Sequence, residues 1–213
     1  MAELPRDDEE QLIARSQRGD IDAFNYLVLH YQQSAYGVAY RMLGDTELAA
    51  DVTQDVFIAA FRNIQSFRPG SSFRAWLLRI ASNMACDYWR RIQRHPQESL
   101  DILTDEDELH SADDLGALVA PGQEENPEAY VLNQELQEVI QQGLATLPLE
   151  QREAVVLCDI EGLTYEEIAT ATATSLGTVR SRIARGRARL RNYLYKHQEL
   201  LPRNYRLSTD RDS

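Results

Sequence analysis

The feature that most restricts how this chain can fold is a long acidic stretch near its middle. Residues 95–128 contain eleven Asp and Glu residues but no Arg or Lys, with a proline close to each end. Its apolar residues are too few and too irregularly spaced to build a packed core, so the stretch is predicted to be a linker. At 213 residues, the chain is long enough for two small domains. The predicted parts are an N-terminal domain over 1–94, an acidic flexible linker over 95–127, a C-terminal domain over 128–198 and a tail over 199–213.

The positive charge is concentrated near the C-terminus, although the whole chain has a net charge of −12. No acidic residue lies between Leu176 and Tyr195. At 100° per residue, this segment predicts a helix with one apolar stripe and arginines over the remaining arc. The stripe contains Val179, Ile183, Leu190 and Leu194, and the arginines are Arg180, Arg182, Arg185, Arg187, Arg189 and Arg191. Because a solvated helix would mix its charges, this pattern favours nucleic-acid binding.

A short acidic amphipathic segment and a break of small residues precede the arginine helix, beginning at Thr164. This order predicts a helix-turn-helix whose second helix contacts DNA. In the N-terminal domain, the apolar periodicity predicts four helices, at about 8–18, 22–42, 46–66 and 72–94. No segment has a convincing strand pattern. The predicted fold class is therefore all-α, with two small helical domains and a helix-turn-helix in the second.

The helix predicted at 46–66 has two distinct faces. Its apolar arc is expected to face the core and contains Leu48, Val52, Val56, Phe57, Ala59, Ala60, Phe61 and Ile64. The opposite face carries Glu47, Asp51, Gln54, Asp55 and Arg62, with Ile58 among them. An exposed isoleucine in an acidic patch suggests an interface, but a solvated face with one stray apolar residue fits equally well.

The helix predicted at 72–94 combines a core face with a face suited to unpaired bases. The expected core residues are Phe73, Leu77, Ile80, Ala81, Met84 and Tyr88. The other face gathers Trp76, Arg79, Asn83, Arg90 and Arg94, and aromatic, guanidinium and amide groups of this kind can stack on bases or bond their edges. The alternative for Trp76 is ordinary packing. The preceding loop, from Phe67 to Phe73, offers the hydroxyls of Ser71 and Ser72 to an extruded base.

Nothing in the sequence suggests catalysis, a cofactor or a metal. There is no phosphate-binding glycine loop, the four histidines are scattered, and Cys86 and Cys158 are isolated. There is also no signal peptide and no apolar run of about 18 residues. We therefore expect a cytoplasmic protein with no membrane insertion.

Four motifs occur in order along the chain: DVTQDVFIAAFRNIQSF, FRAWLLRIASNMACDYWRR, LPLEQREAVVLCDIEGLTYEEIA and GTVRSRIARGRARLR. Together they resemble the extracytoplasmic-function (ECF) class of bacterial sigma factors, the transcription initiation subunits of RNA polymerase. The resemblance implies a non-catalytic factor that binds core RNA polymerase and promoter DNA. It also implies an anti-sigma factor as a regulatory partner. Two alternatives fit parts of the same pattern: a helix-turn-helix transcription regulator and a sigma-mimicking partner-switch protein.

The resemblance implies three binding surfaces. The clamp coiled coil of the largest polymerase subunit is expected to bind Glu47, Asp51, Gln54, Asp55 and Ile58, and the flap of the second-largest subunit to bind the helix that begins near Leu149. The −10 promoter element is expected to contact Phe67, Ser71, Ser72, Phe73, Trp76, Arg79, Asn83 and Arg90. The −35 element is expected to contact Thr178, Arg180, Ser181, Arg182, Ala184 and Arg185.

The chain departs from the family pattern at three positions. Ala173 replaces a common turn glycine, Ala184 replaces a larger side chain, and Gly186 replaces a usual alanine inside the second helix of the motif. If the turn is left-handed, an alanine there costs about 1 kcal/mol. The acidic linker has two open interpretations: a solvated tether, or a segment that occupies nucleic-acid sites of the polymerase before RNA does.

Overall fold

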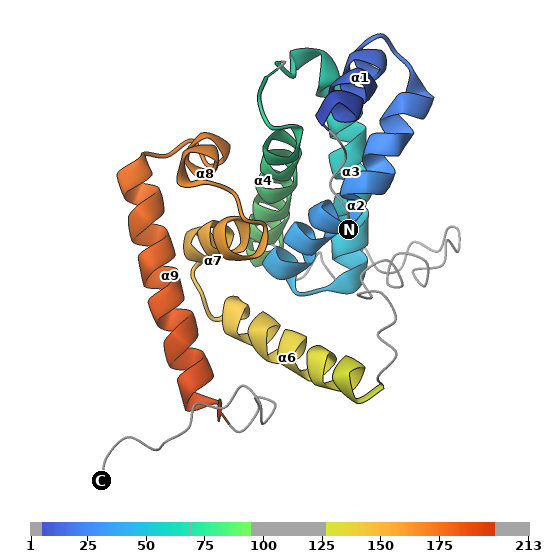
Figure 1. The fold of residues 1–213 in the computed structure, drawn as a ribbon. Helices are drawn as coiled ribbons and strands as arrows, with labels where there is room; N and C mark the ends of the chain where they lie inside the picture. The colour runs from blue at the N-terminus through green and yellow to red at the C-terminus, as the bar shows by residue number, and fades with distance from the viewer. Residues whose placement is uncertain (1–5, 69, 95–126, 199–213) are drawn as a thin grey trace.

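The computed structural model describes residues 6–68, 70–94 and 127–198, and every regular element within these ranges is helical (Figure 1). This agrees with the all-α fold class and with the helices predicted from the periodicity, whereas the predicted linker, except Pro127, and the predicted tail lie outside the described residues. The N-terminal half contains α1 (Arg6–Gln17), α2 (Ile21–Leu43), α3 (Thr46–Asn63), the 3-10 turn η1 (Ile64–Ser66) and α4 (Phe73–Arg94). The C-terminal half contains α6 (Pro127–Ala145), α7 (Leu149–Val155), the π-helical turn η2 (Val156–Ile160), α8 (Tyr165–Ala171) and α9 (Leu176–Lys196).

Local capping explains where the N-terminal helices begin and end. The Asp20 carboxylate accepts a hydrogen bond from the Ala23 N–H at 3.0 Å, and Asp45 accepts one from the Leu48 N–H at 3.0 Å. Both satisfy backbone donors that a helix start leaves unpaired. Gly44 ends α2 in the left-handed region, with φ at 78°, which glycine adopts without steric cost.

The face of α3 that was predicted to be apolar lies in the core of the N-terminal half. Val52, Val56, Phe57, Ala60 and Ile64 are buried, and Leu48, Ala59 and Phe61 are half-buried. Full burial of one such aliphatic side chain contributes about 1.5–3 kcal/mol. Ile58, on the opposite face, is 48% exposed. The assignment of the two faces of α3 is therefore confirmed.

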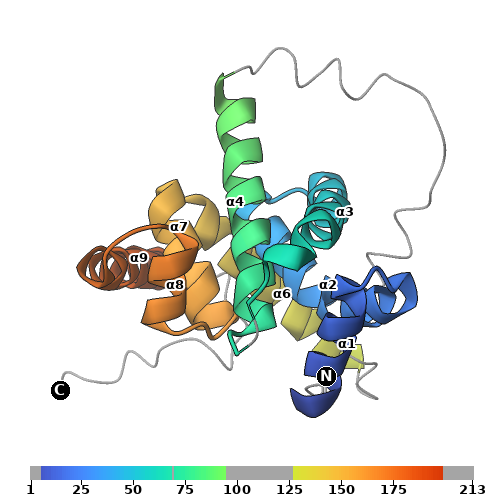
Figure 2. The same cartoon turned by 90° about the horizontal axis from the view of Figure 1, so that it is seen from above.

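Helix α4 is buried on a second side that the sequence did not predict. Phe73, Leu77 and Ala81 are buried as expected, whereas Ile80, Met84 and Tyr88 are only half-buried. Four further residues are buried instead: Leu78, Ser82, Ala85 and Cys86. The reason is visible in Figure 2, where α4 lies between α1, α2 and α3 on one side and α7, α8 and α9 on the other. The two halves share one continuous hydrophobic core.

Candidate nucleic-acid and polymerase interfaces

Helices α8 and α9 form the predicted helix-turn-helix. A capping box starts α8, because the Thr164 hydroxyl accepts from the Glu167 N–H while the Glu167 carboxylate accepts from the Thr164 N–H. Ser175 caps α9 by accepting from the Thr178 N–H at 3.1 Å. Between the helices, Ala173 has a φ of 50°, so the turn keeps the left-handed conformation without a glycine. The chain therefore tolerates the strain at this position.

The buried face of α9 fixes this helix closely against α7. Val179 is 0% and Ile183 is 1% exposed, while Leu190 and Leu194 lie half-buried farther along the same stripe. Gly186 sits at the closest approach, since a Cβ there would lie 2.6 Å from the Val155 Cγ2. The missing side chain lets the two helices pack together and explains why glycine is found inside this helix.

The predicted −35 residues lie on the first three turns of α9, on the side away from this packing. Arg180, Ala184 and Arg185 are exposed, and Thr178, Ser181 and Arg182 are half-buried. The Arg185 Nε donates to the Ser181 carbonyl at 3.1 Å and its Nη2 to the Ser181 Oγ at 3.0 Å. Among the described residues, Arg180 and Arg182 have no ion-pair partner.

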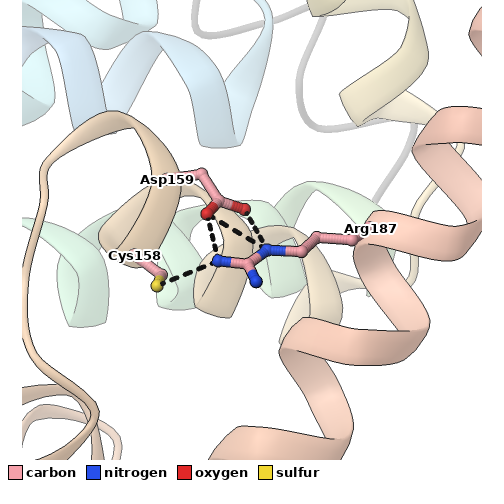
Figure 3. Close-up of polar contacts among 3 residues, drawn as sticks. All are labelled: Cys158, Asp159 and Arg187. Atoms are coloured by element: carbon pink, nitrogen blue, oxygen red, sulfur yellow. Dashed lines mark hydrogen bonds and ion pairs between the residues drawn. The ribbon is translucent and has the colours of Figure 1, made fainter.

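Unlike Arg180 and Arg182, Arg187 forms an ion pair, and its partner is Asp159 (Figure 3). Its Nε donates to both carboxylate oxygens of Asp159, at 3.0 and 3.2 Å, and its Nη2 lies 3.6 Å from the Cys158 Sγ. The hydrogen bonds to Asp159 raise the pKa of Arg187 above its usual range. The helix itself contains no carboxylate, as the sequence shows, but the sequence did not reveal that Asp159 of η2, 28 positions away, pairs with Arg187. The remaining arginines still lack acids on their own helix.

The predicted −10 residues on α4 separate into a surface group and a supporting group. Arg79, Asn83 and Arg90 are exposed, and Arg90 forms an ion pair with Asp87 at 3.0 Å. Phe67 and Phe73 are 5% and 1% exposed, so they lie in the core and not at a surface where a base could stack. The half-buried Trp76 packs on both, with ring centroids 5.5 and 5.4 Å away.

The serines before α4 are both exposed. The Ser72 Oγ accepts from the Ala75 N–H at 3.1 Å, so it caps α4, and the Ser71 hydroxyl donates to the Arg68 carbonyl. These bonds leave the Ser72 O–H free to donate and the Ser71 oxygen free to accept, so each hydroxyl can still bond a base.

All five residues predicted to bind the polymerase clamp are exposed on one face of α3: Glu47, Asp51, Gln54, Asp55 and Ile58. Ile58 also borders a largely apolar groove between α2 and α3. The groove is lined by Ile21, Phe24, Asn25, Val28, Phe57, Ile58, Phe61 and Arg62. An apolar groove beside an acidic helix face is suited to a partner helix with apolar and basic side chains. The sequence identified Ile58 but missed the α2 side of the groove, because Ile21 is remote in the chain.

Helix α7, where a flap contact was predicted, is mostly buried. Leu149, Arg152, Glu153, Ala154 and Val155 are all buried. A partner can therefore reach this side of α7 only if the neighbouring helices move away.

Within the described ranges, no group of three His, Cys, Asp or Glu residues is arranged to hold a metal ion. No helix in these ranges is long and apolar enough to cross a membrane. Burial raises the pKa of both the Cys86 and Cys158 thiols, which disfavours the reactive thiolate.

Comparison with known proteins gives consistent matches to both halves. The family model for sigma-70 region 2 matches residues 27–95, and the model for sigma-70 region 4 matches residues 137–190. The ECF sigma factor SigE of Mycolicibacterium smegmatis is 41% identical over 184 residues, covering 86% of this chain and 66% of that protein. The RNA polymerase sigma-H factor of Pseudomonas aeruginosa is 39% identical, covering 86% of this chain and 92% of the relative. The sigma-E factor of Escherichia coli K12 is 38% identical, with coverages of 86% and 93%.

Two solved structures have a similar fold. The sigma factor RpoE of Bartonella quintana, in complex with the anti-sigma factor NepR, aligns with a TM-score of 0.60 at 24% identity and covers 80% of this chain and 96% of that one. CnrH in complex with the cytosolic domain of CnrY aligns with a TM-score of 0.58 at 26% identity, with coverages of 88% and 97%.

Proposed function

This chain belongs to the ECF family of sigma factors and directs RNA polymerase to promoters, and we propose that it divides promoter recognition between α9 and α4. Sigma factors are not enzymes, as the sequence predicted. Core RNA polymerase supplies the chemistry, and this chain supplies recognition by binding. Because polymerase and promoter DNA lie in the bacterial cytoplasm, this chain is proposed to act there.

Helix α9 is proposed to bind the −35 element in the major groove, between residues 178 and 185. The observation that carries this proposal is the pair of arginines, Arg180 and Arg182, that have no ion-pair partner among the described residues. An arginine guanidinium can bond the O6 and N7 of guanine together, and the first turns of a recognition helix are the part that contacts base edges. Ala184 offers a methyl group, suited to apolar contact with a thymine methyl.

The exposed face of α4 is proposed to hold the melted −10 strand. Arg79 and Arg90 supply charge for the backbone, and Asn83 supplies an amide for a base edge. Phe67 and Phe73 take a positioning role in this proposal, because they support Trp76 from the core. Ser71 and Ser72 lie just before α4. The Ser72 hydroxyl can donate to an extruded base and the Ser71 oxygen can accept from one, while both keep their local hydrogen bonds.

The acidic face of α3 and the adjoining groove are proposed to bind the clamp coiled coil of core polymerase, with Ile58 and Ile21 as apolar contacts. A second proposed partner is an anti-sigma factor. In the two solved structures of similar fold, RpoE is bound to the anti-sigma factor NepR and CnrH is bound to the cytosolic domain of CnrY, and these complexes support the proposal.

The test of promoter recognition is in vitro transcription with core polymerase and a promoter identified by mapping start sites. Arg180→Ala is expected to weaken promoter binding by about 1–3 kcal/mol and to relax sequence preference at one −35 position. Arg187→Ala is a matched control, because Asp159 already holds this guanidinium. A uniform loss on every DNA sequence would assign Arg180 to phosphate contact. Failure of the unsubstituted chain to initiate with core would reject the function.

The polymerase surface is tested by measuring the affinity of the chain for core. Ile58→Asp is expected to weaken binding at least about tenfold, which is about 1.4 kcal/mol. Ile160→Asp is the control, because Ile160 is a comparably exposed isoleucine in the C-terminal half, at 41% against 48%. The same measurements separate the two alternatives. A helix-turn-helix regulator would bind DNA but not core polymerase, and a sigma-mimicking partner-switch protein would bind an anti-sigma factor but not DNA.

A further inference from the structure

The loop that leads into α4 carries both serines that are proposed to bond an extruded base. Ser71 and Ser72 lie in it, and none of its described residues from Phe67 to Ser72 belongs to a helix. The Ser72 cap fixes the end of the loop at α4. A binding site built on a loop is less precise than one built on a helix unless other residues hold the loop in place. Selection of one base therefore depends on how the start of this loop is fixed.

Packing of the Phe67 ring anchors the start of the loop only in part. The Phe67 side chain is 5% exposed, and its ring centroid lies 5.5 Å from those of Phe73 and Trp76. A packed ring holds one side chain, but rotation about ψ can still turn the peptide group that follows it. The direction in which the chain leaves Phe67 therefore needs a contact with the backbone itself.

Gln17, the last residue of α1, supplies this backbone contact. Its Nε2 donates to the Phe67 carbonyl and to the Ile64 carbonyl, each at 3.0 Å. An amide nitrogen carries two N–H groups, so one side chain can hold both carbonyls. The Phe67 carbonyl belongs to the peptide group that begins the loop, and its position sets the path of the chain toward Ser71. Helix α1 lies beside this loop (Figure 1).

Gln65 completes the contact from the other side. Its Nε2 donates to the Gln17 carbonyl, which lies in the last turn of α1, where a helix supplies no backbone donor. The Ile64 carbonyl also accepts from the Phe67 N–H at 3.1 Å, so the η1 turn is held from two directions. We call Gln17 and Gln65 the glutamine bridge. The half-buried Gln17 side chain joins α1 to the loop through the backbone of η1 and Phe67.

Other contacts hold α1 on the protein independently of the glutamine bridge. Ile13 is 6% exposed and packs in the hydrophobic core. The Tyr31 hydroxyl of α2 donates to the Glu9 carboxylate, two turns before the end of α1. Because both contacts remain when Gln17 is replaced, α1 is a fixed support from which Gln17 reaches the loop. Replacement of Gln17 is therefore expected to release the loop without detaching α1.

We propose that Gln17 is a positioning residue for capture of the −10 base. It acts through the Phe67 peptide group, which determines where Ser71 and Ser72 present their hydroxyls. This inference rests on the proposed role of the loop in holding the melted −10 strand. Hydrogen bonds weaken steeply when donor and acceptor are misaligned, so a loop that can turn at Phe67 discriminates less between bases.

Transcription from paired promoters tests this role. One promoter carries the preferred base and the other a substituted base at the −10 position where substitution lowers initiation most, and the ratio of the two initiation rates is the selectivity. Gln17→Met keeps the length of the side chain but has no N–H donor. It is expected to lower the selectivity by about three- to tenfold, less than the roughly hundredfold cost of a 1 Å misplacement. A loss of folded protein alone would lower both rates equally, so an unchanged ratio would overturn the proposal.

Gln11→Met is the matched control, because Gln11 lies on the same helix, is exposed and has no hydrogen-bond partner among the described residues. Its selectivity is expected to equal that of the unsubstituted chain. Gln17→Glu is a second test variant, since an ionised carboxylate only accepts hydrogen bonds and cannot hold the two carbonyls. It is also expected to lower the ratio, and a ratio that both Gln17 variants keep would show that the loop is positioned without this residue.

Ser71→Ala and Ser72→Ala separate this inference from the proposed function. If a serine variant lowers the selectivity and the Gln17 variants do not, the loop binds the base but Gln17 does not position it. If neither serine variant changes the selectivity, or the unsubstituted chain fails to initiate with core, the proposed function of the loop is refuted and the positioning role falls with it.

Discussion

Replacement of Gly186 by alanine is expected to destabilise the fold, although helix propensity alone predicts the opposite. Alanine in a helix interior is favoured over glycine by about 1 kcal/mol. The added Cβ, however, would lie 2.6 Å from the Val155 Cγ2 and 3.1 Å from the Gln151 carbonyl oxygen. Carbon atoms in good contact are about 3.5–4.0 Å apart, and Val155 is buried with little room to move. Overpacking of a core costs about 1–3 kcal/mol, so the steric cost outweighs the propensity.

The expected net loss for Gly186→Ala is about 1 kcal/mol, or about 2–4 °C in melting temperature for a chain of this size. Urea unfolding followed by circular dichroism measures it. Gly177→Ala in the same helix is the matched control, because its Cβ would meet only the Ser175 Oγ at 3.8 Å. That variant is expected to keep or gain stability. The combination of Gly186→Ala with Val155→Ala should lose less than the sum of the two single variants. A stability gain for Gly186→Ala similar to that of Gly177→Ala would refute the steric argument.

Ala173→Gly is expected to raise the unfolding free energy by up to about 1 kcal/mol, because it relieves the left-handed strain at φ 50°; urea unfolding measures the gain, and unchanged stability would contradict it. Burial raises the pKa of Glu161, so its folded form binds a proton more readily than its unfolded form, and its contribution to folding is lost as the pH rises through this pKa. Unfolding at pH 5 and pH 7.5 should therefore show a smaller pH-dependent loss for Glu161→Gln than for the unsubstituted chain. Asp159→Asn is expected to release Arg187 and to steepen the salt dependence of binding to non-specific DNA by up to about one ion, measured by fluorescence anisotropy across a salt series; an unchanged slope would leave Arg187 without a role at phosphate.

The helices and the exposed arginines could be predicted because both depend on local periodicity. In α9, the spacing of Val179 and Ile183 places them on one stripe, and both are buried as expected. The same rule separated the acidic face of α3 from its apolar face. Such patterns survive in any tertiary arrangement, since the core must cover the apolar stripe of each helix.

The contact between the two halves could not be predicted, because its residues follow no periodic rule. Ser82 on α4 is buried although no periodic pattern predicts it, and the sequence alone presents Arg152 and Glu153 as ordinary charged residues. A sequence pattern treats charged residues as exposed, since their burial requires a specific partner elsewhere in the chain. Here those partners are 71 and 110 positions away, at Ser82 and Met42. For the same reason, the pairing of Arg187 with Asp159 was missed.

The choice of polar residues at this junction affects which arrangement the two halves adopt more than how tightly they hold together. A well-packed apolar replacement of a buried ionic cluster is often neutral or stabilising by about 1–4 kcal/mol, so these charges do not add stability over an apolar contact. Apolar contact is already present, because the two halves share one continuous hydrophobic core. Arg152, Glu153 and Glu161 therefore act on specificity. A shift of one half against the other would leave them buried without their partners Met42, Ser82 and Arg74, and an unpaired buried charge is costly.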